Sequence, residues 1–178
     1  MTSNPKKIKI IKNKGIVFWV TGLSGVGKTT ISKNLHKEIS NHFGKTIFFN
    51  GDDFRKIFKL NKYDLNARKE YVLQYSKFCK FVSEQNINVL IAVVGLFDFV
   101  RLRNKEKIQN YVEIFIKASK NNVKRNDKRK IYFKSDVFGK DLKPELPKNS
   151  DISIINDFKK KPEAISKSIF NKILKKIK

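Results

Sequence analysis

Cysteine and long apolar runs are nearly absent from the sequence. The single cysteine, Cys79, excludes an intrachain disulfide, which is typical of proteins from a reducing compartment. The longest apolar run, residues 89–96, is far too short to cross a bilayer. Residues 1–14 carry lysines but no apolar stretch of the length that a secretory signal needs. We therefore expect a cytoplasmic protein that has no membrane partner.

Acidic residues and arginine are also scarce. The 178 residues include 16 Asp and Glu against 40 Lys and Arg, which gives a net charge of +24, and only six of the basic residues are arginine. Lys, Ile, Asn and Phe are abundant together, as A/T-rich codon usage would produce. Such a charge attracts polyanions, but no helix-turn-helix, zinc-finger or RNA-recognition pattern accompanies it. Nucleic-acid binding beyond non-specific attraction is therefore kept only as an alternative.

The sequence does contain a regular alternation of strand and helix patterns, in a chain that is 40% hydrophobic. Short apolar runs predict strands, and apolar residues at helical spacing predict helices. We expect strands at 15–20, 46–49, 89–94, 111–116 and 152–155, and helices at 28–40, from 52 onward, at 66–85 and at 161–178. This alternation implies an α/β fold with a central parallel sheet of about five strands and helices on both faces. A single domain, 1–178, is expected, with 1–14 as a loose basic lead-in.

A glycine-rich turn joins the first predicted strand to the first predicted helix. It has the pattern GxxxxGK[ST] and continues by one threonine, reading Gly22-Leu23-Ser24-Gly25-Val26-Gly27-Lys28-Thr29-Thr30. Glycines let the backbone N–H groups wrap phosphates, and the helix N-terminus adds its dipole. Lys28 would reach the β- and γ-phosphates of ATP, and Thr29 would offer a hydroxyl to Mg²⁺. The alternative is a glycine turn that binds nothing, but the strand-turn-helix context favours a P-loop NTPase fold.

Two carboxylates, Asp52 and Asp53, follow the second predicted strand. Because the carboxyl ends of parallel strands meet at one edge of a sheet, they should lie near the phosphate loop. A carboxylate there can accept a proton from an attacking hydroxyl or hold a magnesium-bound water. Asp is also a good helix N-cap. We favour Asp52 for the chemistry and leave open whether it acts as a base or as a magnesium anchor.

Several strings resemble the adenylyl-sulfate (APS) kinase family. GLSGVGKTT at 22–30 and NGDDFR at 50–55 are similar to the family's GLSGSGKTT and DGDNVR, and Tyr63 with Arg68 is similar to its Gly-Phe-Ser…Asp-Arg segment. Residues 110–116 and 145–151 also match family patterns, so the resemblance runs from about residue 18 to residue 156. It implies an ATP-dependent kinase. Members of the family are often dimers, so a homodimer is kept as one option, and the sequence does not decide the oligomeric state.

The resemblance also implies roles for individual residues. Arg55 and Arg68 would hold the 5′ anionic group of an acceptor nucleotide, and Tyr63 would stack on its base. Arg125, as a catalytic residue, and Lys128 would lie on a lid at about 119–140 that closes over ATP. The rest of the expected acceptor site is Val94, Gly95, Leu96, Phe97 and Arg101. The alternative for each of these residues is a solvated surface charge or a core aromatic.

Departures from the family pattern lie on the acceptor side. The family's Ser-Pro-Tyr-Arg is Gly95-Leu96-Phe97-Asp98 here, which reverses a charge, and its Asn-Ile-Arg-Arg is Tyr71-Val72-Leu73-Gln74. The chain is more similar to a branch from bacterial surface-polysaccharide clusters that phosphorylates the 3′-hydroxyl of cytidine 5′-diphosphoramidate. We therefore expect a nucleotide 3′-kinase with that acceptor, in capsule biosynthesis. The alternatives are a kinase that converts adenylyl sulfate to 3′-phosphoadenylyl sulfate and a nucleic-acid-binding protein switched by ATP.

Overall fold

The central element of the computed structural model is a five-stranded sheet with the order β2-β3-β1-β4-β5. The structure describes residues 7–126, 130 and 137–177. Every neighbouring pair of strands is parallel, with Val17 of β1 opposite both Val89 of β3 and Tyr111 of β4. The strands are β1 Val17–Thr21, β2 Thr46–Asn50, β3 Asn88–Ala92, β4 Tyr111–Lys117 and β5 Ile152–Ile155. The predicted fold class is confirmed.

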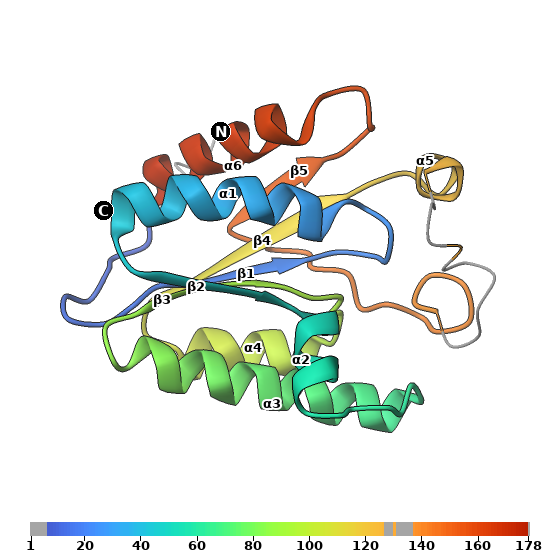
Figure 1. Cartoon of the computed structure of the whole chain (residues 1–178), viewed down its shortest axis with the longest axis horizontal. Helices are drawn as coiled ribbons and strands as arrows, with labels where there is room; N and C mark the ends of the chain where they lie inside the picture. The colour runs from blue at the N-terminus through green and yellow to red at the C-terminus, as the bar shows by residue number, and fades with distance from the viewer. Residues whose placement is uncertain (1–6, 127–129, 131–136, 178) are drawn as a thin grey trace.

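Helices cover both faces of the sheet (Figure 1). On one face lie α1, Lys28–Phe43, and α6, Pro162–Lys176, which pack against each other. On the other face lie α3, Leu65–Ser83, and α4, Asp98–Lys107. Two short helices follow strand ends: α2, Gly51–Ile57, after β2 and α5, Lys120–Arg125, after β4. Among the described residues, no helix is long and apolar enough to cross a membrane.

Each face of the sheet carries its own apolar cluster. Ile31, Leu35 and Ile39 of α1 pack with β-strand residues and with the isoleucine stripe of α6. Tyr71, Tyr75 and Cys79 of α3 pack on the opposite face. All five residues of β3 are buried, as expected of a central parallel strand. Cys79 is fully buried, and burial raises the pKa of its thiol well above the usual range, which fits core packing.

The prediction missed α4, because residues 98–107 contain few apolar residues at helical spacing. The helix is held by Val100, which is fully buried, and by the buried polar residues Arg101 and Asn104. A helix anchored by ion pairs and hydrogen bonds leaves a weak periodic signal.

The sheet topology places the functional segments at one edge. The segments after β1, β2 and β3 are the glycine turn, the start of α2 and residues 93–97, and all three leave the carboxyl ends of neighbouring strands. The chain leaves β1 toward β2 on one side and reaches β4 on the other, so the crevice at this edge is a switch point of the sheet. Ligands of open α/β sheets bind at such points.

Candidate active site

The glycine turn between β1 and α1 has the conformation of a phosphate-binding loop. Gly27, the N-cap of α1, has φ 87°, and Gly22 has φ 153°. A Cβ on Gly22 would lie 2.4 Å from the carbonyl oxygen of Ile116, so a side chain cannot fit without moving β4. The two glycines therefore allow both the backbone angles and the close approach of the turn to the sheet.

A residue from the far end of the sheet supports this loop. Asn156 follows β5 and is 5% exposed, and its Nδ2 donates a hydrogen bond to the carbonyl of Val26 (3.0 Å). Its Oδ1 accepts one from the backbone N–H of Phe158 (3.0 Å). No role for Asn156 could be predicted from the sequence, because a single Asn after a short strand carries no motif.

Lys28 lies across the loop that precedes it. Its Nζ donates hydrogen bonds to the carbonyls of Gly22 (2.9 Å) and Leu23 (2.8 Å), and the residue is 8% exposed. The loop carbonyls thus hold the ammonium group beside the space that the loop encloses.

The two carboxylates after β2 have different local roles. Asp53 completes a capping box: its Oδ2 accepts hydrogen bonds from the backbone N–H (3.0 Å) and side-chain Nδ2 (2.6 Å) of Asn50. Asn50 in turn accepts from the backbone N–H groups of Asp52 and Asp53. Asp53 thus serves the capping box as its third helical residue, with Asn50 as the N-cap, whereas Asp52 lines the pocket beside Lys28 and Thr29.

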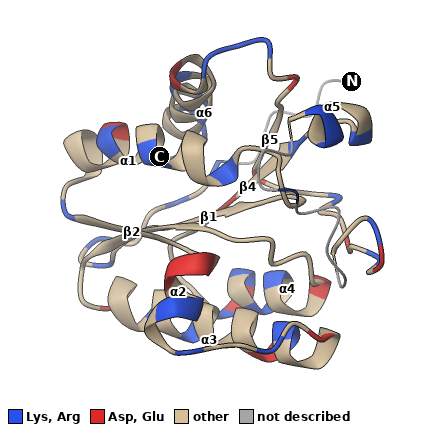
Figure 2. Cartoon of the chain, turned by 45° about the vertical axis from the view of Figure 1, so that its right-hand side comes forward, with Lys and Arg blue, Asp and Glu red and all other residues tan. Residues whose placement is uncertain are grey.

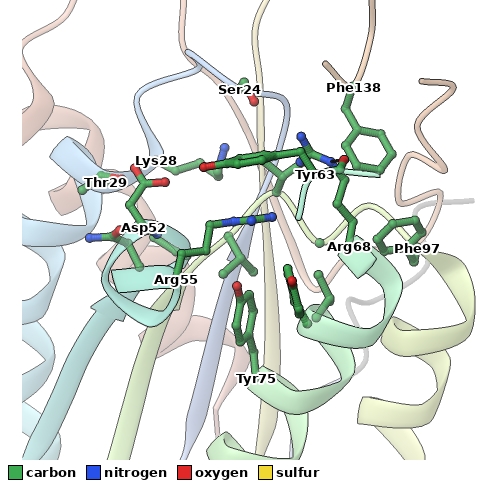
Figure 3. A pocket seen from close by; sticks show the side chains of 18 of the residues that line it. Ser24, Lys28, Thr29, Asp52, Arg55, Tyr63, Arg68, Tyr75, Phe97 and Phe138 are labelled. Carbon is green, nitrogen blue, oxygen red and sulfur yellow. Dashed lines mark hydrogen bonds between the residues drawn. The ribbon is translucent and has the colours of Figure 1, made fainter. Parts of the chain in front are cut away.

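A pocket of about 340 Å³ joins these groups to the acceptor residues expected from the sequence (Figure 3). Its far wall is residues 92–95 and Phe97, tied to β1 by the hydroxyl of Thr21, which donates to the carbonyl of Val94 (2.5 Å). Its lining includes ten residues that the sequence singled out: Ser24, Lys28, Thr29, Asp52, Arg55, Tyr63, Arg68, Val94, Gly95 and Phe97.

Two arginines and Tyr63 form a cationic, aromatic wall of the pocket. The guanidinium carbon of Arg55 lies 4.4 Å from the ring centroid of Tyr63, and that of Arg68 lies 5.5 Å from it. Arg55 donates to the carbonyls of Leu60 (3.1 Å) and Lys62 (2.9 Å), and Arg68 donates to that of Tyr63 (2.6 Å). The chain itself therefore places two guanidinium groups within one small space.

Sequence reasoning missed aromatic residues in the same pocket. Tyr71 and Tyr75 line it from α3, and Phe138 lines it from residues far along the chain. The Phe138 ring centroid is 5.7 Å from the guanidinium carbon of Arg68. Tyr71 stands where the family has an asparagine, and this departure from the family pattern could have indicated that it lines the pocket. Tyr75 looked like one more apolar position of an amphipathic helix.

Some expected site residues lie elsewhere. Thr30 is on α1, Leu96 is fully buried, and Arg125 is exposed at the end of α5; the structure does not bring these three into the pocket. Lys128 and the other residues of the expected lid at 127–129 and 131–136 lie outside the described residues.

Arg101 also lies outside the pocket lining, in a buried ion-pair network. Its Nε is 3.0 Å from Oε1 of Glu113, it pairs with Asp98, and its Nη1 donates to the carbonyl of Glu145 (2.5 Å). Lys105 is 3.5 Å from the other oxygen of Glu113. Burial raises the pKa of Glu113 against the opposing effect of both cations. The network joins α4, β4 and the segment before β5.

The basic residues are spread over the molecule. Figure 2 shows lysine and arginine on both helical layers, on α5 and on the loop before α6. The charge therefore belongs to many elements.

Comparison with known proteins gives consistent matches. The family model for adenylylsulphate kinase matches residues 14–155. The cytidine diphosphoramidate kinase of Campylobacter jejuni is 30% identical over 168 residues, which is 89% of this chain and 99% of that protein. The adenylyl-sulfate kinase of Gloeothece citriformis is 25% identical over 174 residues, 94% of this chain and 96% of that protein.

The solved structure of the Mycobacterium tuberculosis APS kinase in complex with AMPPNP and APS has the same fold. It superposes with a TM-score of 0.80 at 17% identity, covering 90% of this chain and 98% of that one. The family model covers most of the chain, and so do the alignments with the two relatives, which decides the family to which the chain belongs. The chain belongs to the adenylylsulphate kinase family and is an APS-kinase-like nucleotide kinase.

Proposed function

We propose that this protein transfers the γ-phosphate of ATP to the ribose 3′-hydroxyl of a small nucleotide that carries a 5′-linked anionic group. The observation that supports this most strongly is the composition of one pocket. It brings Lys28, Thr29 and Asp52 together with Arg55 and Arg68. Groups suited to a donor phosphate and groups suited to an anionic acceptor thus face the same space.

On the donor side, the phosphate loop would bind the polyphosphate through its backbone N–H groups, and Lys28 would exchange its two loop carbonyls for phosphate oxygens. Thr29 and Asp52 offer the hydroxyl and carboxylate oxygens that Mg²⁺ prefers, with phosphates and water completing its coordination. Bound magnesium would neutralise charge on the phosphates. Asp52 would accept the acceptor's hydroxyl proton or anchor a magnesium-bound water. Arg125 and Lys128 would close over ATP from the lid.

A second hollow adjoins the phosphate loop away from the arginines. It has a volume of about 1080 Å³ and is lined by Leu23 and Val26, by residues 115–118 at the end of β4 and by residues 143–148. We assign the nucleoside of ATP to this side, because the apolar loop residues and the lid helix α5 flank the same strand end.

On the acceptor side, Arg55 and Arg68 suit phosphoryl or similar oxygens because a guanidinium presents a planar fork of donors. Tyr63 and Phe138 both contact Arg68, and a base could stack between these rings if the arginine turned toward the anionic group. The preferred acceptor is cytidine 5′-diphosphoramidate. Support comes from the relative of that name and from Asp98, which replaces a family arginine and pairs with Arg101.

Adenylyl sulfate is the second candidate acceptor. The family model and the adenylyl-sulfate kinases among the relatives favour it, and the phosphate loop, Asp52, Arg55 and Arg68 would serve either substrate.

The test measures ATP consumption with Mg²⁺ and each of the two acceptors, with Lys28→Ala as the blank. We expect turnover of the cytidine compound and little of adenylyl sulfate. Turnover of adenylyl sulfate alone would replace the preferred acceptor with the second candidate. The absence of turnover above the blank with both acceptors would contradict the proposed function.

A further inference from the structure

The hydroxyl of Tyr75 is a buried polar group without a partner. Tyr75 is 3% exposed, and its hydroxyl oxygen has no hydrogen-bond partner among the residues that the structure describes. Leaving such a group unsatisfied in the core is costly, and a phenylalanine would fill the same space. An unpaired buried hydroxyl therefore indicates a role other than packing.

This hydroxyl points toward the pocket. Tyr75 lines it, and Figure 3 shows the phenol oxygen directed toward Arg55, which lies above it. Tyr71, one turn earlier on α3, lines the same pocket, but its hydroxyl already accepts a hydrogen bond from the backbone N–H of Lys62 (3.4 Å). Of these two phenols, Tyr75 is the one that makes no hydrogen bond of either kind within the described part of the chain.

The protonation state of Tyr75 suits a donor to an anion. Burial raises its pKa to about 12, so the phenol is neutral at physiological pH and can donate its proton. The groups facing it are Arg55, Tyr71, Asp52 and Arg68. Arg55 now donates to the carbonyls of Leu60 and Lys62. If its guanidinium moved onto an anionic group of the ligand, the space above the phenol would open to the same group.

We propose that the Tyr75 hydroxyl donates a hydrogen bond to the distal group of the acceptor's 5′ chain, and so selects nucleotides that carry a second phosphoryl-type group beyond the α-phosphate. This inference rests on the proposed function for the identity of the acceptor. The reacting hydroxyl must lie near Lys28 and Asp52, whereas Tyr75 lies beneath Arg55 at the floor of the pocket. A hydrogen bond from the Tyr75 hydroxyl therefore recognises the group at the end of the 5′ chain.

The test compares Tyr75→Phe with Tyr111→Phe, a matched loss of a buried phenol hydroxyl outside the pocket, where Asn104 is the partner (3.5 Å). Binding of cytidine 5′-diphosphate and cytidine 5′-monophosphate is measured by titration calorimetry with ADP present, together with thermal unfolding. For Tyr75→Phe we expect affinity for the diphosphate to fall about 10- to 100-fold, the range of a hydrogen bond to a charged group. Affinity for the monophosphate and for ADP should not change, and the melting temperature should not fall.

Equal weakening of both nucleotides, unchanged diphosphate affinity, or no diphosphate binding by the wild type would each overturn the proposal. Turnover measured in parallel separates the two ideas. Selective loss of diphosphate binding with no kinase activity in the wild type would refute the proposed function and leave the role of Tyr75 standing. Kinase activity with no effect of Tyr75→Phe would do the reverse.

Discussion

Removing the guanidinium of Arg101 should destabilise the fold without weakening acceptor binding. The resemblance implies an acceptor role for this residue, but the structure places it against Glu113, whose side chain is 2% exposed. The variant Arg101→Met keeps the aliphatic stem and removes the charge. It leaves a buried carboxylate with Lys105 as its remaining partner, 3.5 Å from the other oxygen.

The size of the effect follows from the burial of the pair. Breaking a buried ion pair by removing one partner costs about 3–5 kcal/mol. Because Lys105 remains, we expect the lower end, about 3 kcal/mol, or a melting temperature lower by about 6–12 °C for a domain of this size. The folded pKa of Glu113 is already raised, and losing Arg101 raises it further. Stability is then lost as pH rises through that folded pKa, so the deficit should be larger at pH 8 than at pH 5.

Denaturant and thermal unfolding at both pH values, with acceptor KM in native buffer, form the assay. Asp98→Asn is the control, because the Asp98 side chain is 54% exposed and an exposed pair contributes less than about 1 kcal/mol. Unchanged stability of Arg101→Met with a raised acceptor KM would refute this reasoning and restore the acceptor role.

Three further predictions concern the pocket. Asp52→Asn should lower kcat by about 10²–10⁴-fold with ATP affinity retained. Asp53→Asn should weaken the capping box around Asn50, at a cost of about 1 kcal/mol at most, and keep its kcat; equal kinetic losses in steady-state assays would contradict this division. Gly22→Ala should abolish ATP binding in a fluorescence titration, because its Cβ would meet the Ile116 carbonyl at 2.4 Å, and wild-type affinity would contradict the loop geometry. Burial raises the pKa of Tyr75 to about 12, so the fold should lose stability to ionisation of this phenol as pH rises from about 10 toward 12, and Tyr75→Phe should remove that loss; in phenolate absorbance titrations of wild type minus Tyr75→Phe, ionisation near pH 10 would contradict its burial.

The sequence predicted the sheet and the glycine turn between β1 and α1 because those signals are local. A buried strand, a glycine turn and a helix follow one another from residue 17 to residue 43, and each can be recognised from a short stretch of sequence. The division between Asp52 and Asp53 was also within reach, since the capping box lies inside residues 50–53.

The parts of the site that the sequence did not predict depend on contacts between residues that are far apart in the chain. Asn156 supports Val26 across 130 positions, and Phe138 reaches the pocket from beyond β4. Arg101 matched a family position, but its surroundings come from Glu113 and Glu145, which no local pattern reveals. Tyr75 sits at a regular apolar position of α3, so its hydroxyl gave no periodic signal.

The proposed function requires one pocket to bring the γ-phosphate of ATP to the ribose of a nucleotide acceptor. The most direct measurement is transfer of label from γ-labelled ATP to cytidine 5′-diphosphoramidate in the presence of Mg²⁺, followed by treatment with a 3′-nucleotidase. The account predicts a labelled nucleotide whose label the 3′-nucleotidase releases, and none with Lys28→Ala. Label that appears only as free phosphate, or in a nucleotide that resists the 3′-nucleotidase, would contradict it.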